Sequence, residues 1–297
     1  MTTRLIMPLT VLMLILTACQ GGGSDQSAGS EESAGTVGSA AASGAATGEI
    51  PTVEVDVTGD NVSEVQESGT LRCGVKYDVL AFGFRNPESG EVEGLDADLC
   101  RAIADSMGVE PEFIEAISAN RIPYLQEDRV DVVISTMTVN EERLEQIDFS
   151  HVYYVAGQSI LVMEDSDIES VEDLPGHPVC TGAGSTSADN LREAGVEDVL
   201  EYETYTEGAQ NLVNGVCDAV STDNTILFGL AEQFPGTKLV GGEFTEEPLG
   251  IGIAKEREDL VEYVNAVLEG LKENGGLTQL YETWITQYTG ETPEPPF

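Results

Sequence analysis

Basic residues are scarce in this chain: 13 lysine and arginine residues stand against 54 aspartate and glutamate residues. Arg143 follows an apolar segment that ends at Ser135–Thr138, and its planar guanidinium could hold a carboxylate through two parallel hydrogen bonds. An arginine on a solvated helix would have the same sequence context, and most arginines are exposed. Arg143 is therefore a candidate carboxylate ligand, with a surface role as the alternative.

Two other segments carry polar groups next to predicted strands. Gly184–Ser187 lies directly before a predicted helix, where exposed N–H groups attract an anion and the hydroxyls of Ser185 and Thr186 can assist. Simple N-capping explains these residues equally well, and both roles can coexist. Asp223 follows the strand Cys217–Val220, and the residues alone favour a turn or N-cap role for it.

The elements that position these residues alternate between strands and helices. Strands are predicted at 70–75, 111–117, 130–134, 178–180, 200–202, 217–220 and 238–240. Helices are predicted at 61–68, 97–107, 122–127, 206–214, 225–233, 258–271 and 277–288, with a further one ending at 193. Asp96 is expected to cap the helix at 97–107. This order predicts parallel sheets with helices on both faces.

The pattern occurs twice, which predicts two α/β lobes. Two apolar extended stretches, 155–163 and 249–254, connect the halves. A ligand is then expected in the cleft, near the carboxyl ends of the strands. We expect residues 53–155 and 248–297 in lobe one and 156–247 in lobe two.

Four cysteines remain once Cys19 is set aside, and an even number in an exported domain suggests two disulfides. Three pairings are possible. Cys73–Cys100 and Cys180–Cys217 are favoured, because each pair is close in sequence and would lie within one lobe. The lack of a C-x-x-C spacing, together with only two histidines, argues against a metal site.

Three ordered motifs resemble the signature of family 3 extracellular solute-binding proteins, the polar amino-acid receptors of ABC importers: Gly94–Leu99, Thr138–Arg143 and Ile147–Ser150. The resemblance runs from about Gly69 to Tyr288. It implies a type II periplasmic-binding-protein fold, α/β with two lobes joined by two hinge strands. Ser118–Pro123 and Gly184–Ser187 are similar to the glutamate/aspartate-binding branch.

The resemblance assigns roles to the candidate residues. Arg143 matches the family's clamp for the ligand's α-carboxylate, and Thr136 and Thr138 would add main-chain contacts. Ser185 and Thr186 would assist from lobe two, and Asp223 matches the acid that binds the α-ammonium. A buried amino acid needs partners for both of its charged groups.

The side-chain end of the site points to an acidic ligand. Lys76, Ser118 and Arg121 stand where the glutamate/aspartate binders carry a cation, a serine and an arginine. Two cations suit a distal carboxylate, whereas neutral glutamine would leave them underpaired. Arg121 is the safer of the two assignments, because lysines usually point to solvent. Two departures bear on the pocket: Ser118 removes the family's common aromatic wall, and Thr222 replaces a bulkier polar residue.

The first 52 residues predict export and anchoring. An apolar run from Leu5 to Leu16 ends at Leu16–Cys19, which resembles a bacterial lipobox with lipidation at Cys19. We expect a signal peptide at 1–18 and a flexible Gly/Ser/Ala linker at 19–52. An ordinary signal peptide with a chance cysteine is the alternative. The protein is thus expected on the outer face of the cell membrane, extracellular or periplasmic.

The predicted function is a lipid-anchored monomeric receptor. It would bind L-glutamate or L-aspartate by hinge closure and deliver it to an ABC permease with a cytoplasmic ATPase. No cofactor, no metal and no nucleic acid are expected, and the membrane is contacted through the lipid alone. The alternatives are a receptor for glutamine or another polar amino acid, an exported dehydratase or cell-wall lyase of the same fold, and a sensor domain that needs a partner. The acidic surplus could be an adaptation to high salt.

Overall fold

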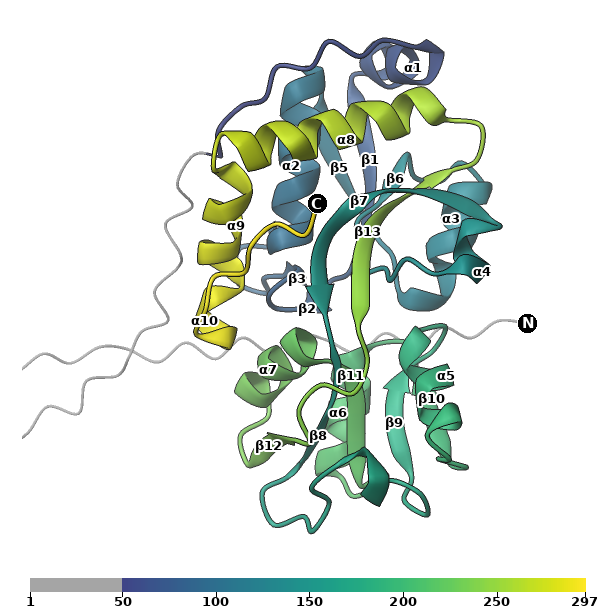
Figure 1. Ribbon diagram of the computed structural model, residues 1–297, viewed down its shortest axis with the longest axis vertical. Helices are drawn as coiled ribbons and strands as arrows, with labels where there is room; N and C mark the ends of the chain where they lie inside the picture. The colour runs from purple at the N-terminus through teal and green to yellow at the C-terminus, as the bar shows by residue number, and fades with distance from the viewer. Residues whose placement is uncertain (1–49) are drawn as a thin grey trace, which may run out of the picture. The chain divides into compact units, whose positions relative to one another are not determined.

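The computed structural model describes residues 50–297. The predicted signal peptide, the lipidation site Cys19 and the linker up to residue 49 lie outside the described residues. Within residues 50–297, every helix is too short or too polar to cross a bilayer. Figure 1 shows two separate sheets, each flanked by helices, which is the predicted α/β organisation.

The sheet of lobe one has five strands. In sheet order they are β5 (Glu110–Glu115), β1 (Thr70–Val75), β6 (Val132–Val133), β13 (Glu247–Ala254) and β7 (Ile147–Ala156). β1 runs parallel to β5 and β6, whereas β13 runs antiparallel to β6 and β7. A small sheet beside it contains β2 (Asp78–Val79), β3 (Gly83–Arg85) and β4 (Val92–Glu93).

The sheet of lobe two also has five strands. In sheet order they are β10 (Val199–Tyr202), β9 (Val179–Gly182), β11 (Ala219–Asp223), β8 (Gln158–Met163) and β12 (Thr237–Val240). β9 pairs in parallel with β10 and β11, and β8 is antiparallel to β11 and β12. The parallel strands end near the first lobe, so residues that follow them enter the cleft.

Helices cover the faces of both sheets. Lobe one contains α1 (Asp60–Ser68), α2 (Leu95–Met107), α3 (Arg121–Gln126), α4 (Glu141–Leu144), α8 (Glu258–Glu273), α9 (Gly276–Trp284) and α10 (Thr286–Thr289). Lobe two contains α5 (Thr186–Glu193), α6 (Tyr205–Val213) and α7 (Asn224–Gln233). α2 packs on β1 and β5, and α6 packs on β9. Short 3-10 turns lie at Ser118–Asn120 and Val171–Asp173.

Two connections join the lobes. β7 continues through Gly157 into β8, and the chain returns from β12 into β13. β7 and β13 pair with each other and lie side by side where the chain passes between the sheets (Figure 1). The first connection falls in the predicted stretch 155–163, whereas the second lies at 241–246, before the predicted stretch 249–254. The fold class predicted from the sequence is confirmed by this architecture.

The structure forms both disulfides that the sequence favoured. Cys73 of β1 bonds Cys100 of α2, with Cα atoms 6.3 Å apart, and Cys180 of β9 bonds Cys217 before β11, at 5.9 Å. Each bond ties a helix or strand to a neighbour within one lobe. The cleft between the lobes is therefore not cross-linked by either disulfide.

The prediction that Asp96 caps the first long helix is wrong. The N-cap is Gly94, and Asp96 lies buried inside the first turn of α2. Its carboxylate accepts hydrogen bonds from the Thr136 N–H at 3.0 Å and the Tyr153 hydroxyl at 2.7 Å. These long-range partners hold the carboxylate where a local cap cannot form. Asp96 thereby connects α2 to the segment that enters the cleft.

Candidate ligand-binding site in the interlobe cleft

Arg143 lies at one end of the cleft, on the short helix α4. The side chain of Asn140 accepts the Arg143 backbone N–H at 2.9 Å and so caps this helix. The guanidinium is buried, and its Nη1 donates to the Thr138 carbonyl at 2.7 Å. Nη2 reaches the Gly184 carbonyl of lobe two at 3.5 Å. Arg143 therefore contacts both lobes, which a solvated surface arginine would not do.

Thr136 has an unusual backbone conformation beside this arginine. Its φ of 43° lies in the left-handed region that threonine rarely adopts. The Asp96 carboxylate holds its N–H. Its hydroxyl oxygen is buried and has no hydrogen-bond partner among residues 50–297. Strain and an orphaned hydroxyl together are typical of a residue whose conformation serves a site.

Lys76 and Arg121 lie close together with Ser118. Lys76 follows β1 and is 2% exposed, so the expectation that lysines point to solvent does not hold here. Its Nζ donates to the Ser118 hydroxyl at 2.9 Å. Arg121 is equally buried and donates through Nε and Nη1 to the carbonyls of Ser118, Ser135 and Thr136, at 2.8–3.2 Å. Lys76 and Arg121 thus each keep two N–H donors for a ligand.

Burial disfavours the charged forms of both Lys76 and Arg121. Burial and, after it, the nearby charge of Arg121 lower the pKa of Lys76 to about 7. The pKa of Arg121 is lowered by burial and then by Arg143. Arg121 is thus close enough to Lys76 and Arg143 for their like charges to disfavour one another, and an anionic ligand group would relieve this repulsion.

Lobe two contributes the loop before α5. Gly184 has a φ of +73°, and a Cβ there would lie 2.7 Å from the Ala119 backbone of lobe one, so glycine permits this close approach. Ser185 is the N-cap residue, but its hydroxyl donates to the Gly182 carbonyl instead of capping the helix. The Thr186 hydroxyl donates to Glu247 at 2.9 Å. The predicted hydroxyl contacts are therefore already made within the protein.

Asp223 ends β11 and is buried at the base of the cleft. It occupies the N-cap position of α7, yet its side chain makes no capping hydrogen bond. Burial and, after it, the charge of Glu247 raise the pKa of its carboxyl to about 7. Lys76, Arg121 and Arg143 act in the opposite direction. A buried carboxyl that does not cap its helix suits an incoming ammonium group.

Glu247 is a central residue that the sequence did not identify. It begins β13, and its buried carboxylate accepts four hydrogen bonds: from Thr138 and Thr245 at 2.8 Å, from Thr186 at 2.9 Å and from Asn190 at 2.8 Å. Thr138 belongs to lobe one and Thr186 to lobe two. Glu247 is one of 54 acidic residues in the chain, and no local sequence feature distinguishes it from the others.

Tyr205 and Asp78 are two further residues that the sequence did not identify. The Tyr205 ring, at the start of α6, lies 5.2 Å from the Lys76 ammonium, measured to the ring centroid. Asp78 of β2 accepts the Tyr205 N–H at 2.8 Å and the Thr206 N–H at 3.4 Å. The Thr204-x-x-Glu207 capping box could have placed the helix start here, but nothing local points across the cleft.

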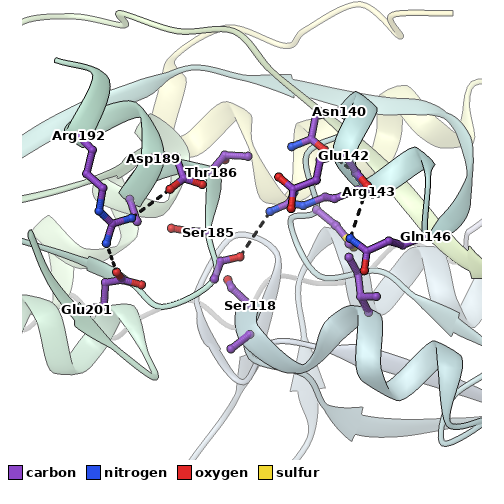
Figure 2. Close-up of a pocket in the computed structure, with 15 residues that line it drawn as sticks. Ser118, Asn140, Glu142, Arg143, Gln146, Ser185, Thr186, Asp189, Arg192 and Glu201 are labelled. Carbon is purple, nitrogen blue, oxygen red and sulfur yellow. Dashed lines mark hydrogen bonds and ion pairs between the residues drawn. The ribbon is translucent and has the colours of Figure 1, made fainter.

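A cavity of about 230 Å³ opens between the lobes. Figure 2 shows Arg143 and Asn140 on one side of it and Ser185 and Thr186 on the other. Ser118 also lines it. Five of the nine predicted ligand residues do not line this cavity: Lys76, Arg121, Thr136, Thr138 and Asp223. Eight of the nine are nonetheless buried, and Thr186 is partly buried.

The arrangement offers a distinct partner for each end of a small zwitterion. Arg143 can take a carboxylate and Asp223 an ammonium, while Lys76 and Arg121 lie near a second anionic position. Among residues 50–297, no three histidine, cysteine or acidic side chains are placed to hold a metal ion. The geometry is that of a recognition site for an amino acid.

Comparison with known proteins agrees with this geometry. Residues 71–287 match the bacterial extracellular solute-binding proteins, family 3. The ABC transporter glutamine-binding protein GlnH of Bacillus subtilis is 42% identical over 237 residues, which are 78% of this chain and 87% of GlnH. The glutamate-binding protein GluB of Corynebacterium glutamicum is 35% identical over 250 residues, 78% of this chain and 83% of GluB.

A solved structure shares the whole fold. The ancestral amino acid-binding protein AncCDT-1, a precursor of cyclohexadienyl dehydratase, is 36% identical with a TM-score of 0.71. The match covers 76% of this chain and 99% of that one. The relatives thus include proteins that bind glutamine and glutamate, and one precursor of an enzyme.

Proposed function

The chain belongs to family 3 of the bacterial extracellular solute-binding proteins, and from this premise we propose that its ligand is an acidic amino acid, glutamate or aspartate. It is the amino-acid-binding protein of an ABC importer. The finer proposal concerns which side chain the cleft accepts. The two named relatives bind glutamine and glutamate, so the choice has to come from the residues of this site.

The buried ammonium of Lys76 carries the proposal. It is 2% exposed, and Ser118 is the side chain that accepts from it. A carboxylate would supply the missing counter-charge, with Arg121 close by. The amide of glutamine would leave the charge uncompensated, at a cost of about 1–3 kcal/mol. The site therefore favours glutamate or aspartate over their amides.

The α-groups of the ligand would bind at the other residues of the cleft. We assign the α-carboxylate to Arg143, supported by the main chain at Thr136 and Thr138 and by Ser185 and Thr186 at the start of α5. The α-ammonium is assigned to Asp223. Because these residues come from both lobes, ligand binding would favour the closed arrangement.

An enzymatic role is the second candidate, because AncCDT-1 is a precursor of a dehydratase. The two histidines of the chain argue against it. His151 pairs with Glu269 at 3.0 Å and His177 with Asp218 at 2.8 Å, all four side chains being well exposed. Neither histidine lies among the nine site residues. We propose binding without catalysis, with no cofactor.

We propose further that Cys19 carries a lipid and tethers the protein to the outer face of the cell membrane through the linker at 19–52. The permease and its ATPase are the partners that this family implies. Cys19 and the linker up to residue 49 lie outside the described residues, so mass spectrometry of the mature N-terminus is the direct test.

The function is tested by calorimetry on the protein freed of bound amino acid by unfolding and refolding. Glutamate, aspartate, glutamine, asparagine and arginine are titrated in turn. We expect the two acidic amino acids to bind at least about tenfold more tightly than their amides, following the cost of an uncompensated buried charge. Preference for a neutral or basic amino acid would overturn the acidic assignment.

Arg143→Ala tests whether Arg143 binds the α-carboxylate of the ligand. Loss of the bidentate partner leaves the ligand's buried α-carboxylate unpaired, so binding of every amino acid should fall at least about a hundredfold. Retained micromolar affinity in this variant would contradict the clamp. If the unmodified protein binds none of these amino acids, the enzyme and sensor alternatives are favoured.

A further inference from the structure

At the side-chain end of the cleft, Ser118 stands where an aromatic wall is common in the family, as the sequence analysis noted. Lobe two places a different aromatic residue there. Tyr205 begins α6, is 5% exposed, and presents its ring 5.2 Å from the Lys76 ammonium of lobe one. A ring facing a buried ammonium at this distance is a cation–π contact.

The position of the ring is fixed on both sides. Gly182, at the end of β9, lies against it: a Cβ at Gly182 would come 2.8 Å from the ring atom Cε1. On the lobe-one side, Asp78 accepts the backbone N–H groups of Tyr205 and Thr206. Lys76 and Asp78 are two residues apart and so hold Tyr205 by its ring and by its main chain. β2 and α6 are neighbours in the structure (Figure 1).

The charges of two other predicted ligand residues act on the Tyr205 phenol. Burial raises the pKa of this phenol, and the charge of Asp223 raises it further, while Arg121 opposes the shift. Tyr205 therefore contacts Lys76 and lies within the electrostatic influence of Arg121 and Asp223. No other aromatic ring has a recorded cation–π contact with a site cation among residues 50–297.

We infer that Tyr205 is a specificity-determining residue, which lobe two adds to the Lys76 end of the pocket on closure. This inference rests on the proposed function. The ring supports the ammonium in its charged, inward orientation, where it can meet a distal carboxylate. Without the ring, Lys76 is able to turn away, and the advantage of an acidic ligand over its amide is lost.

The test measures the ratio of the dissociation constants for glutamine and glutamate. Tyr205→Leu removes the ring, and the ratio should fall by about tenfold, as expected for a desolvated cation–π contact. Tyr205→Phe keeps the ring and should hold the ratio within about threefold of the unmodified protein, since the phenol hydroxyl is not the contact. Tyr202→Leu, in the same lobe, is the matched control and should leave the ratio unchanged.

If Tyr205→Leu does not fold, a graded series of ring variants at position 205 provides the test. Phenylalanines with increasing fluorination, introduced at position 205, keep the size of the ring and weaken its negative face. The ratio should fall steadily along this series. A ratio that stays constant through the series overturns the inference.

An unchanged ratio in a folded Tyr205→Leu protein overturns the assignment to the ring. If the unmodified protein does not prefer glutamate, the proposed function fails independently of these variants.

Discussion

Lys76 and Asp223 are both buried beside groups that disfavour their charged forms. Burial lowers the pKa of the lysine and raises that of the aspartic acid, each to about 7. In the proposed site, an acidic amino acid would stabilise the charged form of both, because its ammonium would pair with Asp223 and its distal carboxylate with Lys76. At the residue scale, ligand binding and proton binding are therefore linked.

The linkage predicts a peak in the affinity for glutamate near pH 7. Below pH 7 Asp223 is protonated and must lose its proton to bind the ammonium, so affinity should fall by up to about 50-fold between pH 7 and pH 5. Above pH 7 Lys76 is neutral and must gain a proton to bind the carboxylate, so affinity should fall about tenfold by pH 8.5. Calorimetry from pH 5 to pH 8.5 measures both limbs.

Glutamine provides the comparison for this profile. It shares the acidic limb, which depends on Asp223, but it has no carboxylate to draw a proton onto Lys76. Its affinity should therefore stay level above pH 7. An alkaline limb of equal size for both ligands would show that Lys76 does not meet the ligand side chain.

At the scale of elements, β13 does more than return the chain to lobe one. Its first residue, Glu247, joins Thr138 of lobe one to Thr186 and Asn190 of α5 in lobe two. These threonine hydroxyls are thereby used within the protein, which leaves the main-chain N–H groups near them to meet a ligand. The hinge strand thus holds the two sides of the carboxylate end together.

Glu247→Gln should weaken this connection while preserving the side-chain size. The amide cannot accept from Asn190 and Thr186 as strongly as a carboxylate does, because hydrogen bonds to charged groups contribute about 1.5–3 kcal/mol. We expect affinities for glutamate and glutamine to fall together by about tenfold or more, measured by calorimetry. The exposed neighbour Glu246 provides the control, since Glu246→Gln should change neither. Loss of only one ligand would argue for a direct contact with its side chain.

On the scale of the whole molecule, the dominant property is a formal net charge of −41. Most of these acids have no basic partner to pair with, because the chain has only 13 lysines and arginines. The compact state therefore brings many like charges together, which salt screens over about 10 Å at 0.1 M and about 3 Å at 1 M.

Salt should stabilise the protein as a whole. Raising NaCl from 0.05 M to 1 M is expected to raise Tm by about 5 °C or more, a shift that corresponds to about 2 kcal/mol for a domain of this size. Thermal unfolding followed by circular dichroism measures it. The same series at pH 4, where many carboxylates are protonated, should give a smaller rise. A Tm that is insensitive to salt would contradict the repulsion argument.

The sequence was enough to predict the α/β alternation, the two lobes with their hinge stretches and the family, and to favour one of the three possible disulfide pairings. These follow from local periodicity, from spacing and from ordered motifs, which need no knowledge of distant contacts. It also placed Arg143, Lys76, Arg121 and Asp223 at strand ends or helix starts, because α/β topology brings such positions to one edge.

Only the tertiary structure decided how the charges are paired. Asp96 looked like a helix cap and is instead buried against Thr136 and Tyr153. In the sequence, Glu247 and Tyr205 resemble the other acidic and aromatic residues. Their contacts with residues of the opposite lobe are known only from the packing. The physical reason is that the effect of a buried charge depends on partners far away in the chain, and among 54 acids no local pattern marks the few that are removed from water.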